Sequence, residues 1–339
     1  MRYDFITIIK LVAATFLPVV LSVALYLAEK KTRFGKVQYW KKQTIIGVLF
    51  GGLSVLATEF GRSVEGAILN VRNAAPLTAG LLFGAPSGII AGVIGGVYRF
   101  IATYWGAGEF SQVACTIGCI LAGLFGAGCR KFMFDDKKPS WAYGLAIGGT
   151  TEVFHMLLVF LTNMDDVYGA YKVVALCALP MIICNAVSVM LSLLLVALIG
   201  KERIKKHLKN KHISQVFQFF LMICVVVAFS ATMVFTSVLQ TKIAYANADN
   251  LLLLNLSDVE KDISETSTEE DIRRAVENRH IGKEGGIIVC DDEGKIIYDS
   301  GGHKGESIYT FENANTIKAS PKVRFTANVG KTKSYCMFY

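Results

Sequence analysis

The sequence predicts a polytopic α-helical membrane bundle of six long helices and a short glycine-rich hairpin, followed by a C-terminal α+β domain outside the membrane. Apolar residues make up 53% of the 339 residues, more than in soluble domains. The composition changes after Val238, where 13 Lys and Arg face 16 Asp and Glu. The tail thus carries a net charge of −3 and the preceding 238 residues +11, so the excess of positive charge belongs to the membrane part and does not indicate binding of nucleic acid.

Six apolar segments are long enough to cross a hydrocarbon core of about 30 Å. They cover residues 5–28, 44–60, 111–128, 141–161, 173–199 and 216–238. The first carries Lys10 and lacks a clear cleavage site, so we expect it to remain as an anchor. Lys and Arg gather at 30–42, 130–138 and 201–211. Short basic loops favour the cytoplasmic side, so we expect all three on that side.

Glycine recurs at every fourth position between the second and third long segments, at Gly80, Gly84, Gly88, Gly92 and Gly96, with Pro86 among them. This spacing leaves one helical stripe without side chains and lets a neighbouring backbone approach. For the first two basic loops to share a side, this stretch must return to the side where it began. We predict short helices at 74–84 and 87–101, hinged at Ala85 and Pro86 because proline ends a helix. The alternative is a single kinked span with one loop that violates the charge rule.

Charged residues are rare between 44 and 128, and each lies near the end of a segment: Glu59, Arg62, Glu65, Arg72, Arg99 and Glu109. The hairpin would bring Arg72 and Arg99 to the same outer side. Two guanidiniums there either bind an anion, a carboxylate or phosphate, or pair with Glu59 and Glu65. We interpret Glu65 and Glu109 as anchors at the membrane surface.

Glu152 lies within a membrane segment, with His155 about one turn further along the same helical face. A carboxylate at that depth indicates a functional site, although it can also pair with an arginine of the bundle. Asn185 is the corresponding polar residue of the next segment. We expect both to line the bundle, and the candidate ligand-binding residues are Asn70, Arg72, Arg99, Glu152 and Asn185.

The tail predicts a helix at 264–280, with acidic residues in its first turn and arginines later. A strand, a turn at 291–294 and a second strand follow over 286–299, and further strands are expected near 323–329 and 334–339. Six of the eight cysteines lie in or beside membrane segments, and we treat them as small apolar residues. Cys290 and Cys336 fall on predicted strands, where a disulfide is one possibility. We find no catalytic or metal motif, and predict neither enzymatic activity nor a cofactor.

Several motifs together resemble the LytS-type five-transmembrane receptor region of bacterial sensor proteins. They are Asn70-Val71-Arg72, Ala79-Gly80-Leu81, Gly84-Ala85-Pro86, Tyr98-Arg99-Phe100, Cys115, Ala122-Gly123-Leu124, Glu152 with His155, and Pro180-Met181 with Asn185. The resemblance covers about 44–200. One departure is the loop 101–110, IATYWGAGEF, where the family tends to have Gly-Gly-Phe. The Gly-Ala-Pro hairpin also resembles, more loosely, that of vitamin-transporter substrate-binding subunits.

The resemblance implies a membrane input module that senses an envelope-derived or small-molecule ligand and controls a histidine kinase, diguanylate cyclase or phosphatase domain. The tail is similar to an extracytoplasmic Cache-type sensor domain at 285–289 and 291–299. Such a domain normally precedes a further helix and an output domain, so we expect the chain to be a fragment. The family also implies a multi-pass protein of the bacterial cell membrane, a two-component system and a homodimer.

We therefore expect four parts: residues 1–42, an anchor and basic loop; 43–200, the receptor bundle; 201–240, a basic loop and signalling helix; and 241–339, the external domain. The leading hypothesis is a sensor receptor. The first alternative is a substrate-binding transport subunit that uses the glycine hairpin, and the second is a structural membrane anchor. A transport subunit would need Arg72 or Glu152 for uptake, whereas an anchor would need neither.

Overall fold

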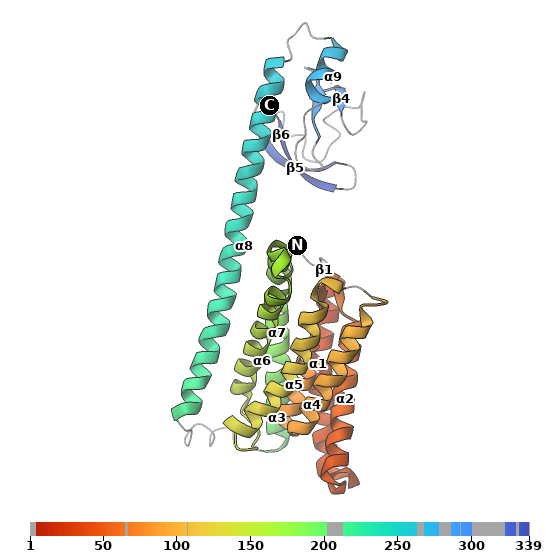
Figure 1. Ribbon diagram of the computed structural model, residues 1–339, viewed down its shortest axis with the longest axis vertical. Helices are drawn as coiled ribbons and strands as arrows, with labels where there is room; N and C mark the ends of the chain where they lie inside the picture. The colour runs from red at the N-terminus through yellow and green to blue at the C-terminus, as the bar shows by residue number, and fades with distance from the viewer. Residues whose placement is uncertain are drawn as a thin grey trace. The chain divides into compact units, whose positions relative to one another are not determined.

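The structure is a computed structural model, and it describes residues 5–64, 67–106, 108–201, 213–262, 268–277, 286–291, 293–299, 323–329 and 332–338. These residues form two compact units, Met1–Phe235 and Thr236–Tyr339. The first unit is a helical bundle, and the second combines helix and strand (Figure 1).

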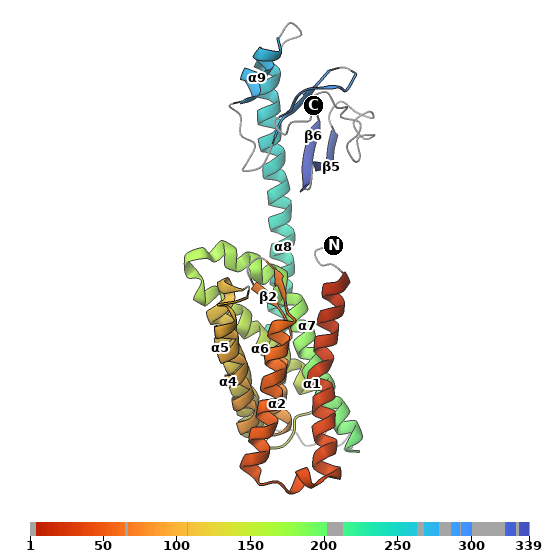
Figure 2. The same cartoon turned by 90° about the vertical axis from the view of Figure 1, so that its right-hand side faces the viewer.

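The bundle is built from helices that run side by side (Figure 2). Their order along the chain is α1 (Phe5–Lys31), α2 (Tyr39–Glu59), α3 (Ala74–Leu82), α4 (Ala85–Ala102), α5 (Gln112–Gly128), α6 (Trp141–Thr162), α7 (Val167–Ile199) and the start of α8 (Ile213–Asp262). Short pieces connect them: η1 (Arg33–Lys36), the strands β1 (Arg62–Val64) and β2 (Ala67–Leu69), η2 (Glu109–Ser111), the π-helical η3 (Cys129–Met133) and η4 (Met164–Asp166). Helix α4 packs on α2 and α5, α6 packs on α7, and α3 lies among α4, α5 and α7.

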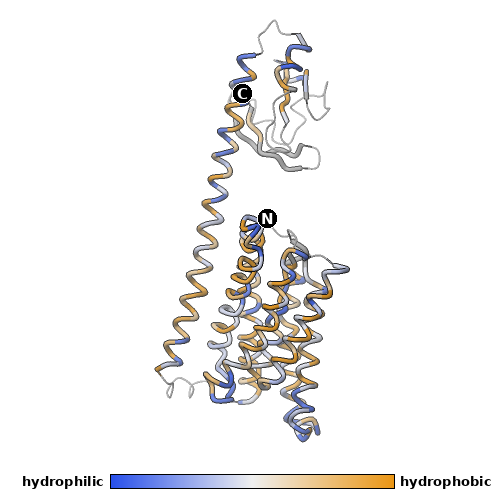
Figure 3. The backbone as a smooth tube through the Cα atoms, in the orientation of Figure 1, coloured by the Kyte–Doolittle hydropathy of each residue, from blue (hydrophilic) through white to orange (hydrophobic). Residues whose placement is uncertain are grey.

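Six helices among the described residues are long and apolar enough to cross a membrane. Four contain the predicted segments at 111–128, 141–161, 173–199 and 216–238, a fifth, Ile9–Lys31, covers the predicted segment 5–28 from Ile9 onward, and the sixth is Ala85–Ala102. The predicted segment 44–60 falls in α2, which ends at Glu59. This helix has 21 residues but is not among the six, which are chosen by length and apolar composition. Figure 3 shows apolar residues along most of the bundle and polar residues where α1 joins α2. The chain is thus a multi-pass membrane protein.

The glycine-rich stretch divides into two helices of unequal length. Helix α3 has 9 residues and α4 has 18, about 13 and 27 Å at 1.5 Å per residue. The prediction of a hinge at Ala85 and Pro86 is wrong, because both residues are already in the first turn of α4, where proline is tolerated. The break lies instead at Gly84, whose φ of 144° is a conformation that favours glycine. Helix α4 is therefore a full-length helix and not the short element that we expected.

Gln43 of α2 satisfies the backbone at this break. Its Nε2 donates to the Phe83 carbonyl at 2.8 Å, and its Oε1 accepts from the Ser87 N–H at 3.2 Å. Gln43 is buried, at 2% exposure. One side chain thus serves both the end of α3 and the start of α4.

The glycine stripe lies where backbones approach most closely. A Cβ on Gly88 would lie 2.6 Å from the Cα of Gly80, and a Cβ on Gly80 would lie 2.8 Å from the Ala127 nitrogen of α5. A Cβ on Gly92 would meet the Cys119 carbonyl oxygen at 3.0 Å, and one on Gly96 would meet the Thr116 carbonyl oxygen at 2.9 Å. These atoms belong to backbone and cannot swing aside. The glycines therefore set the distances between α3, α4 and α5.

Basic residues of the first two loops lie at one end of the bundle. Lys42 pairs with Glu29 at 3.0 Å, and the Lys138 ammonium lies 4.5 Å from the centre of the Tyr26 ring. Arg130 Nη1 donates to the Leu81 carbonyl at 3.1 Å, so the end of α3 belongs to this region too. Of the third basic loop only Lys201 is among the described residues, and 202–212 lie outside them.

Helix α8 is one unbroken helix of 50 residues. It contains the predicted segment 216–238 and continues to Asp262, 24 residues beyond the predicted end. Within the bundle, the Tyr143 hydroxyl donates to the Gln215 carbonyl at 3.0 Å. Within the second unit, Val259 of the same helix packs with Val276 and Ile287.

Among its described residues the second unit contains α9 (Glu269–Glu277) and two antiparallel strand pairs. These are β3 (Ile288–Cys290) with β4 (Ile296–Asp299) and β5 (Val323–Val329) with β6 (Thr332–Phe338). The predicted strand pairs are confirmed within a few residues, whereas the predicted helix at 264–280 is described only over 269–277. Thr268 caps α9: its hydroxyl and N–H both donate to the Asp271 carboxylate, at 2.6 and 3.0 Å. Cys290 and Cys336 are not joined by a disulfide in the structure.

Candidate functional site

The polar residues of the bundle gather around the N-terminus of α3. The chain enters this helix through residues 70–73, whose backbone is held by side chains. The Asn70 Oδ1 accepts from the Arg72 N–H at 3.2 Å, and the Arg72 carbonyl accepts from Ser54 Oγ of α2 at 3.2 Å. The Asn185 Oδ1 of α7 accepts from the Ala74 N–H at 2.8 Å. Because the first N–H groups of a helix carry partial positive charge, this end of α3 is electropositive.

Two fully buried arginines lie at the same site. Arg72 donates through Nη1 to the Thr58 hydroxyl at 3.3 Å and through Nη2 to the Cys115 carbonyl at 3.4 Å. Arg99 donates through Nη2 to the Gly108 carbonyl at 2.6 Å. Both side chains are 0% exposed, and Arg72 Nε, Arg99 Nε and Arg99 Nη1 have no hydrogen-bond partner among the described residues. Donor capacity is therefore left over on both guanidiniums.

Both arginines are buried inside the bundle beside Cys115 of α5, so they lie together as predicted, and the side of the membrane on which they lie stays a prediction. The alternative pairing with Glu59 is wrong, because Glu59 is exposed and accepts instead from the Tyr98 hydroxyl at 2.7 Å. Glu65 lies outside the described residues. Neither arginine makes an ion pair in the part of the chain that the structure describes.

The fully buried carboxylate of Glu152 bonds to the imidazole of His155 and the side-chain amide of Asn73. Its Oε1 lies 2.7 Å from His155 Nδ1, and its Oε2 accepts from Asn73 Nδ2 at 3.0 Å. Asn73 Nδ2 is also 3.2 Å from His155 Nδ1. The alternative in which Glu152 pairs with an arginine is therefore not what the structure contains. His155 can lie this close to α5 because Gly118 faces it, where a Cβ would be 2.7 Å from the His155 Cδ2.

The charge balance of the site favours anions. Two guanidiniums and a helix N-terminus face one carboxylate, and that carboxylate is already bound to His155 and Asn73. Buried charge is costly unless it is paired. A small carboxylate or phosphate would supply acceptors for the unused guanidinium donors. In the part of the chain that the structure describes, no three His, Cys, Asp or Glu side chains lie together in a way that could hold a metal ion.

Comparison with known protein families matches the model for the 5TMR region of 5TMR-LYT proteins to residues 25–199. The chain belongs to this family. Among curated relatives, the sensor histidine kinase YpdA of Escherichia coli is 31% identical over 146 residues, which are 42% of this chain and 24% of that protein. The sensor protein LytS of Staphylococcus saprophyticus is 29% identical over 184 residues, 49% of this chain and 30% of that protein. LytS of Staphylococcus aureus, a sensor histidine kinase/phosphatase, is 27% identical over 193 residues, which are 52% of this chain and 32% of that protein.

The chain thus spans a quarter to a third of the length of the curated relatives that it matches. No solved structure matches it. What the 5TMR-LYT relatives share with this chain is the sensory membrane region, so the chain is a membrane sensor input module.

All five residues predicted to bind ligand meet at one place in the 5TMR-LYT bundle. Each of them is at most 3% exposed. Asn70, Arg72, Glu152 and Asn185 bond to residues at the start of α3 or just before it, and Arg99 joins them through its electrostatic interactions with Arg72 and Cys115. Sequence analysis missed Asn73, Thr58 and the thiol of Cys115. Asn73 directly follows Arg72 at the start of α3, and this position is the signal that could have identified it.

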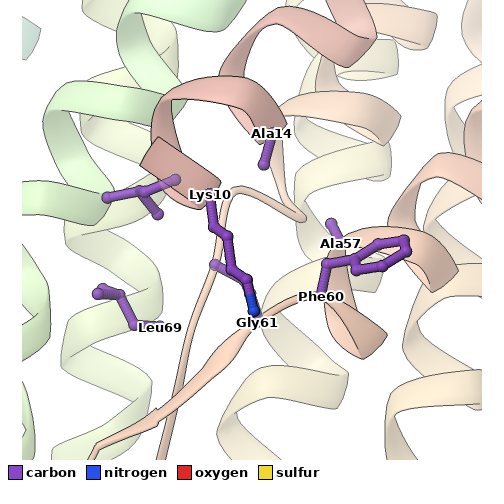
Figure 4. A pocket seen from close by; sticks show the side chains of 8 residues that line it. Lys10, Ala14, Ala57, Phe60, Gly61 and Leu69 are labelled. Carbon is purple, nitrogen blue, oxygen red and sulfur yellow. The ribbon is translucent and has the colours of Figure 1, made fainter. Parts of the chain in front are cut away.

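A small pocket lies beside this site, between α1, α2 and β2 (Figure 4). It has a volume of about 20 Å³, and its lining includes Lys10, Phe60, Gly61, Leu69 and Asn70. Lys10 extends from α1 towards Gly61. Asn70 belongs both to this pocket and to the turn that holds Arg72, so the pocket borders the arginine site.

Proposed function

We propose that the chain is the input module of a bacterial membrane sensor, and that ligand binding in the bundle changes the C-terminal unit through α8. The continuity of α8 is the observation that carries this proposal. Its first part is bonded to α6 at Tyr143, and its last part packs at Val259 in the second unit. A continuous helix that belongs to both units is a physical element that both can bias.

The ligand that we propose is a small anion with a carboxylate or phosphate group. Arg72 and Arg99 would bind it directly through their free N–H groups, near the N-terminus of α3. Asn70 and Asn185 would fix the backbone at Arg72 and Ala74 by accepting hydrogen bonds from their N–H groups. Glu152 would fix the side chain of Asn73 by accepting its hydrogen bond. Bidentate guanidinium contacts would favour planar or tetrahedral oxyanions over halides.

A chain of contacts supports coupling between this site and α8. Arg72 is followed by Asn73, which bonds Glu152 of α6. The same helix faces α8 just before Glu152. Thr150 Oγ1 lies 3.5 Å from the Met222 carbonyl oxygen, and a Cβ on Gly149 would lie 3.1 Å from the side chain of Val226. A shift of α3 on binding would therefore reach α8 through a single intervening helix.

The remaining parts of the proposal concern the whole sensor. The basic loops support a cytoplasmic location for one end of the bundle, so α8 would lead outward to a Cache-like extracytoplasmic unit. An output domain would be supplied beyond this sequence, as the sensor histidine kinase relatives suggest. A homodimer in the bacterial cell membrane and an envelope-derived or small-molecule signal complete the proposal.

Binding by the purified full chain in lipid nanodiscs tests this function. Acetate and inorganic phosphate are titrated while the thermal unfolding midpoint is measured, because a ligand that binds the native state raises this midpoint. We expect at least one anion to raise it in wild type and neither in Arg72→Gln or Arg99→Gln. Lys131→Gln, which removes an exposed charge at the basic end, is the matched control and should respond as wild type. Equal responses in wild type and both arginine variants would contradict the proposal, as would anion uptake into vesicles that is independent of residues 241–339.

A further inference from the structure

The thiol of Cys115 lies in a setting that differs from that of the other buried cysteines. Cys115 is in the first turn of α5 and is 3% exposed. Its side chain interacts with Arg72, His155 and Arg99, which come from three different parts of the bundle. Cationic neighbours stabilise a thiolate, the reactive form of cysteine.

The other buried cysteines provide a comparison within the same bundle. Cys119, one turn further along α5, interacts with Arg72 but with neither Arg99 nor His155. Cys177 of α7 has electrostatic interactions with Cys115 and Glu152, whereas for Cys129 none is found with a described residue. Cys115 alone of these four faces both guanidiniums and the imidazole.

The imidazole beside Cys115 is itself held by a carboxylate. His155 Nδ1 lies 2.7 Å from Glu152 Oε1, and both side chains are at most 2% exposed. A nucleophile, a base and a carboxylate that orients the base form the arrangement by which enzymes activate cysteine. His155 Nε2, Arg72 Nε and two nitrogens of Arg99 have no hydrogen-bond partner among the described residues, so polar groups remain free to act on a bound molecule.

The titratable groups around the thiol are Arg72 from the turn before α3, Arg99 from α4, His155 and Glu152 from α6, Cys177 from α7 and Cys119 from α5. Among the described residues Glu152 is the one carboxylate in this group, and its oxygens are bonded to His155 and Asn73. The electrostatic surroundings of Cys115 are thus dominated by positive charge.

We propose that Cys115 is a covalent modification site that reacts with small, neutral, electron-poor alkenes such as α,β-unsaturated carbonyl compounds. The sulfur bonds to the β-carbon, and the π electrons of the carbon–carbon double bond move to the carbonyl oxygen, which becomes an enolate next to Arg72 and Arg99. The thiol proton passes to His155 and is then returned to the α-carbon. No oxidant or reductant is needed, because the reaction is an addition.

Burial determines which reagents the site accepts. A small neutral reagent reaches the buried thiol without the cost of desolvating a charge, a cost that an anion recovers only by pairing with the arginines. The site would therefore respond to membrane-permeant electrophiles, and this chemistry is separate from reversible anion binding at the arginines. The proposal does not depend on the proposed function.

Alkylation of the full chain in nanodiscs by N-ethylmaleimide tests this proposal. The reaction is quenched at timed intervals, and peptide mass spectrometry gives a rate constant for each cysteine. We expect Cys115 to react about tenfold faster or more than Cys129 and Cys177, with Cys119 between them. Because all four thiols are buried in one wild-type bundle, the comparison requires no variant to fold. A rate at Cys115 that is equal to or below that at Cys129 would overturn the proposal.

Two variants test the role of the imidazole and its carboxylate. In Glu152→Gln and His155→Gln the alkylation rate at Cys115 should fall severalfold at neutral pH and recover at higher pH, while the rate at Cys129 stays the same. Elution volume and thermal unfolding midpoint identify any variant that does not fold. A pH profile of Cys115 alkylation that is unchanged in folded variants would contradict activation by His155.

Discussion

Replacing Gly88 with alanine should separate α3 from α4, because the new Cβ would clash with backbone atoms on both sides. It would lie 2.6 Å from the Gly80 Cα, 2.9 Å from the Gly80 nitrogen and 3.0 Å from the Gly123 carbonyl oxygen, all of them backbone atoms. Since ordinary carbon–carbon contact is about 3.5–4.0 Å, the helices must move apart by roughly 1 Å. Forcing one methyl group into a packed interior costs about 1–3 kcal/mol.

Gly52 of α2 provides the matched control, because a Cβ there would meet nothing within 4 Å. Gly52→Ala should be neutral or stabilising by up to about 1 kcal/mol, since alanine favours helix over glycine. Unfolding by SDS in mixed micelles, followed by circular dichroism, measures the free energy of unfolding of both variants. If Gly88→Ala is as stable as Gly52→Ala, then the glycine stripe does not set the helix separation and our account of the packing fails.

Three further predictions follow from individual contacts. Gln43→Leu should lower the free energy of unfolding by about 2–4 kcal/mol, because it leaves the Phe83 carbonyl and Ser87 N–H buried without partners. The same SDS titration measures this change, and a variant as stable as wild type would show that the helix break at Gly84 does not depend on Gln43. Asn185→Ala should cost about 1–3 kcal/mol, because the Ala74 N–H loses its acceptor, whereas Asn255→Ala on the exposed part of α8 should cost little. Hydrogen bonds from the Thr268 hydroxyl and backbone lower the pKa of the exposed Asp271 carboxyl. The cap therefore contributes its full stability to α9 above the unfolded pKa of about 3.9, and this contribution is lost as pH falls through the lower folded pKa. An NMR titration of Asp271 in wild type and Thr268→Ala should give a higher pKa in the variant, and identical values would refute the cap.

The sequence was sufficient to predict the elements whose signals are local. Long apolar segments gave five of the six candidate spans, and alternation around a tight turn gave β3 and β4. The hinge was misplaced by a residue or two because a proline in the first turn of a helix looks like a helix end. Helix α8 was predicted too short, because its hydropathy falls after Val238 while the helix continues.

The candidate site could be predicted only in part. Polar residues within apolar segments identified Arg72, Arg99, Glu152 and Asn185, since few other residues there are charged or polar. Their partners could not be predicted, because Thr58, Asn73 and Cys115 come from elements that only the folded bundle brings together. The burial of both arginines likewise depends on how α2, α4 and α5 enclose them, which no local pattern contains.

Coupling through α8 is the central claim, and hydrogen–deuterium exchange of the full chain in nanodiscs tests it most directly. Exchange is measured with and without the anion that raises the unfolding midpoint, and the comparison is made for residues 213–235, 236–262 and 286–299. We predict that the anion changes exchange in α8 on both sides of Phe235 and in β3 and β4, and that Arg72→Gln abolishes every change. Protection confined to α3, α4 and α5, with no change beyond Phe235, would contradict the account.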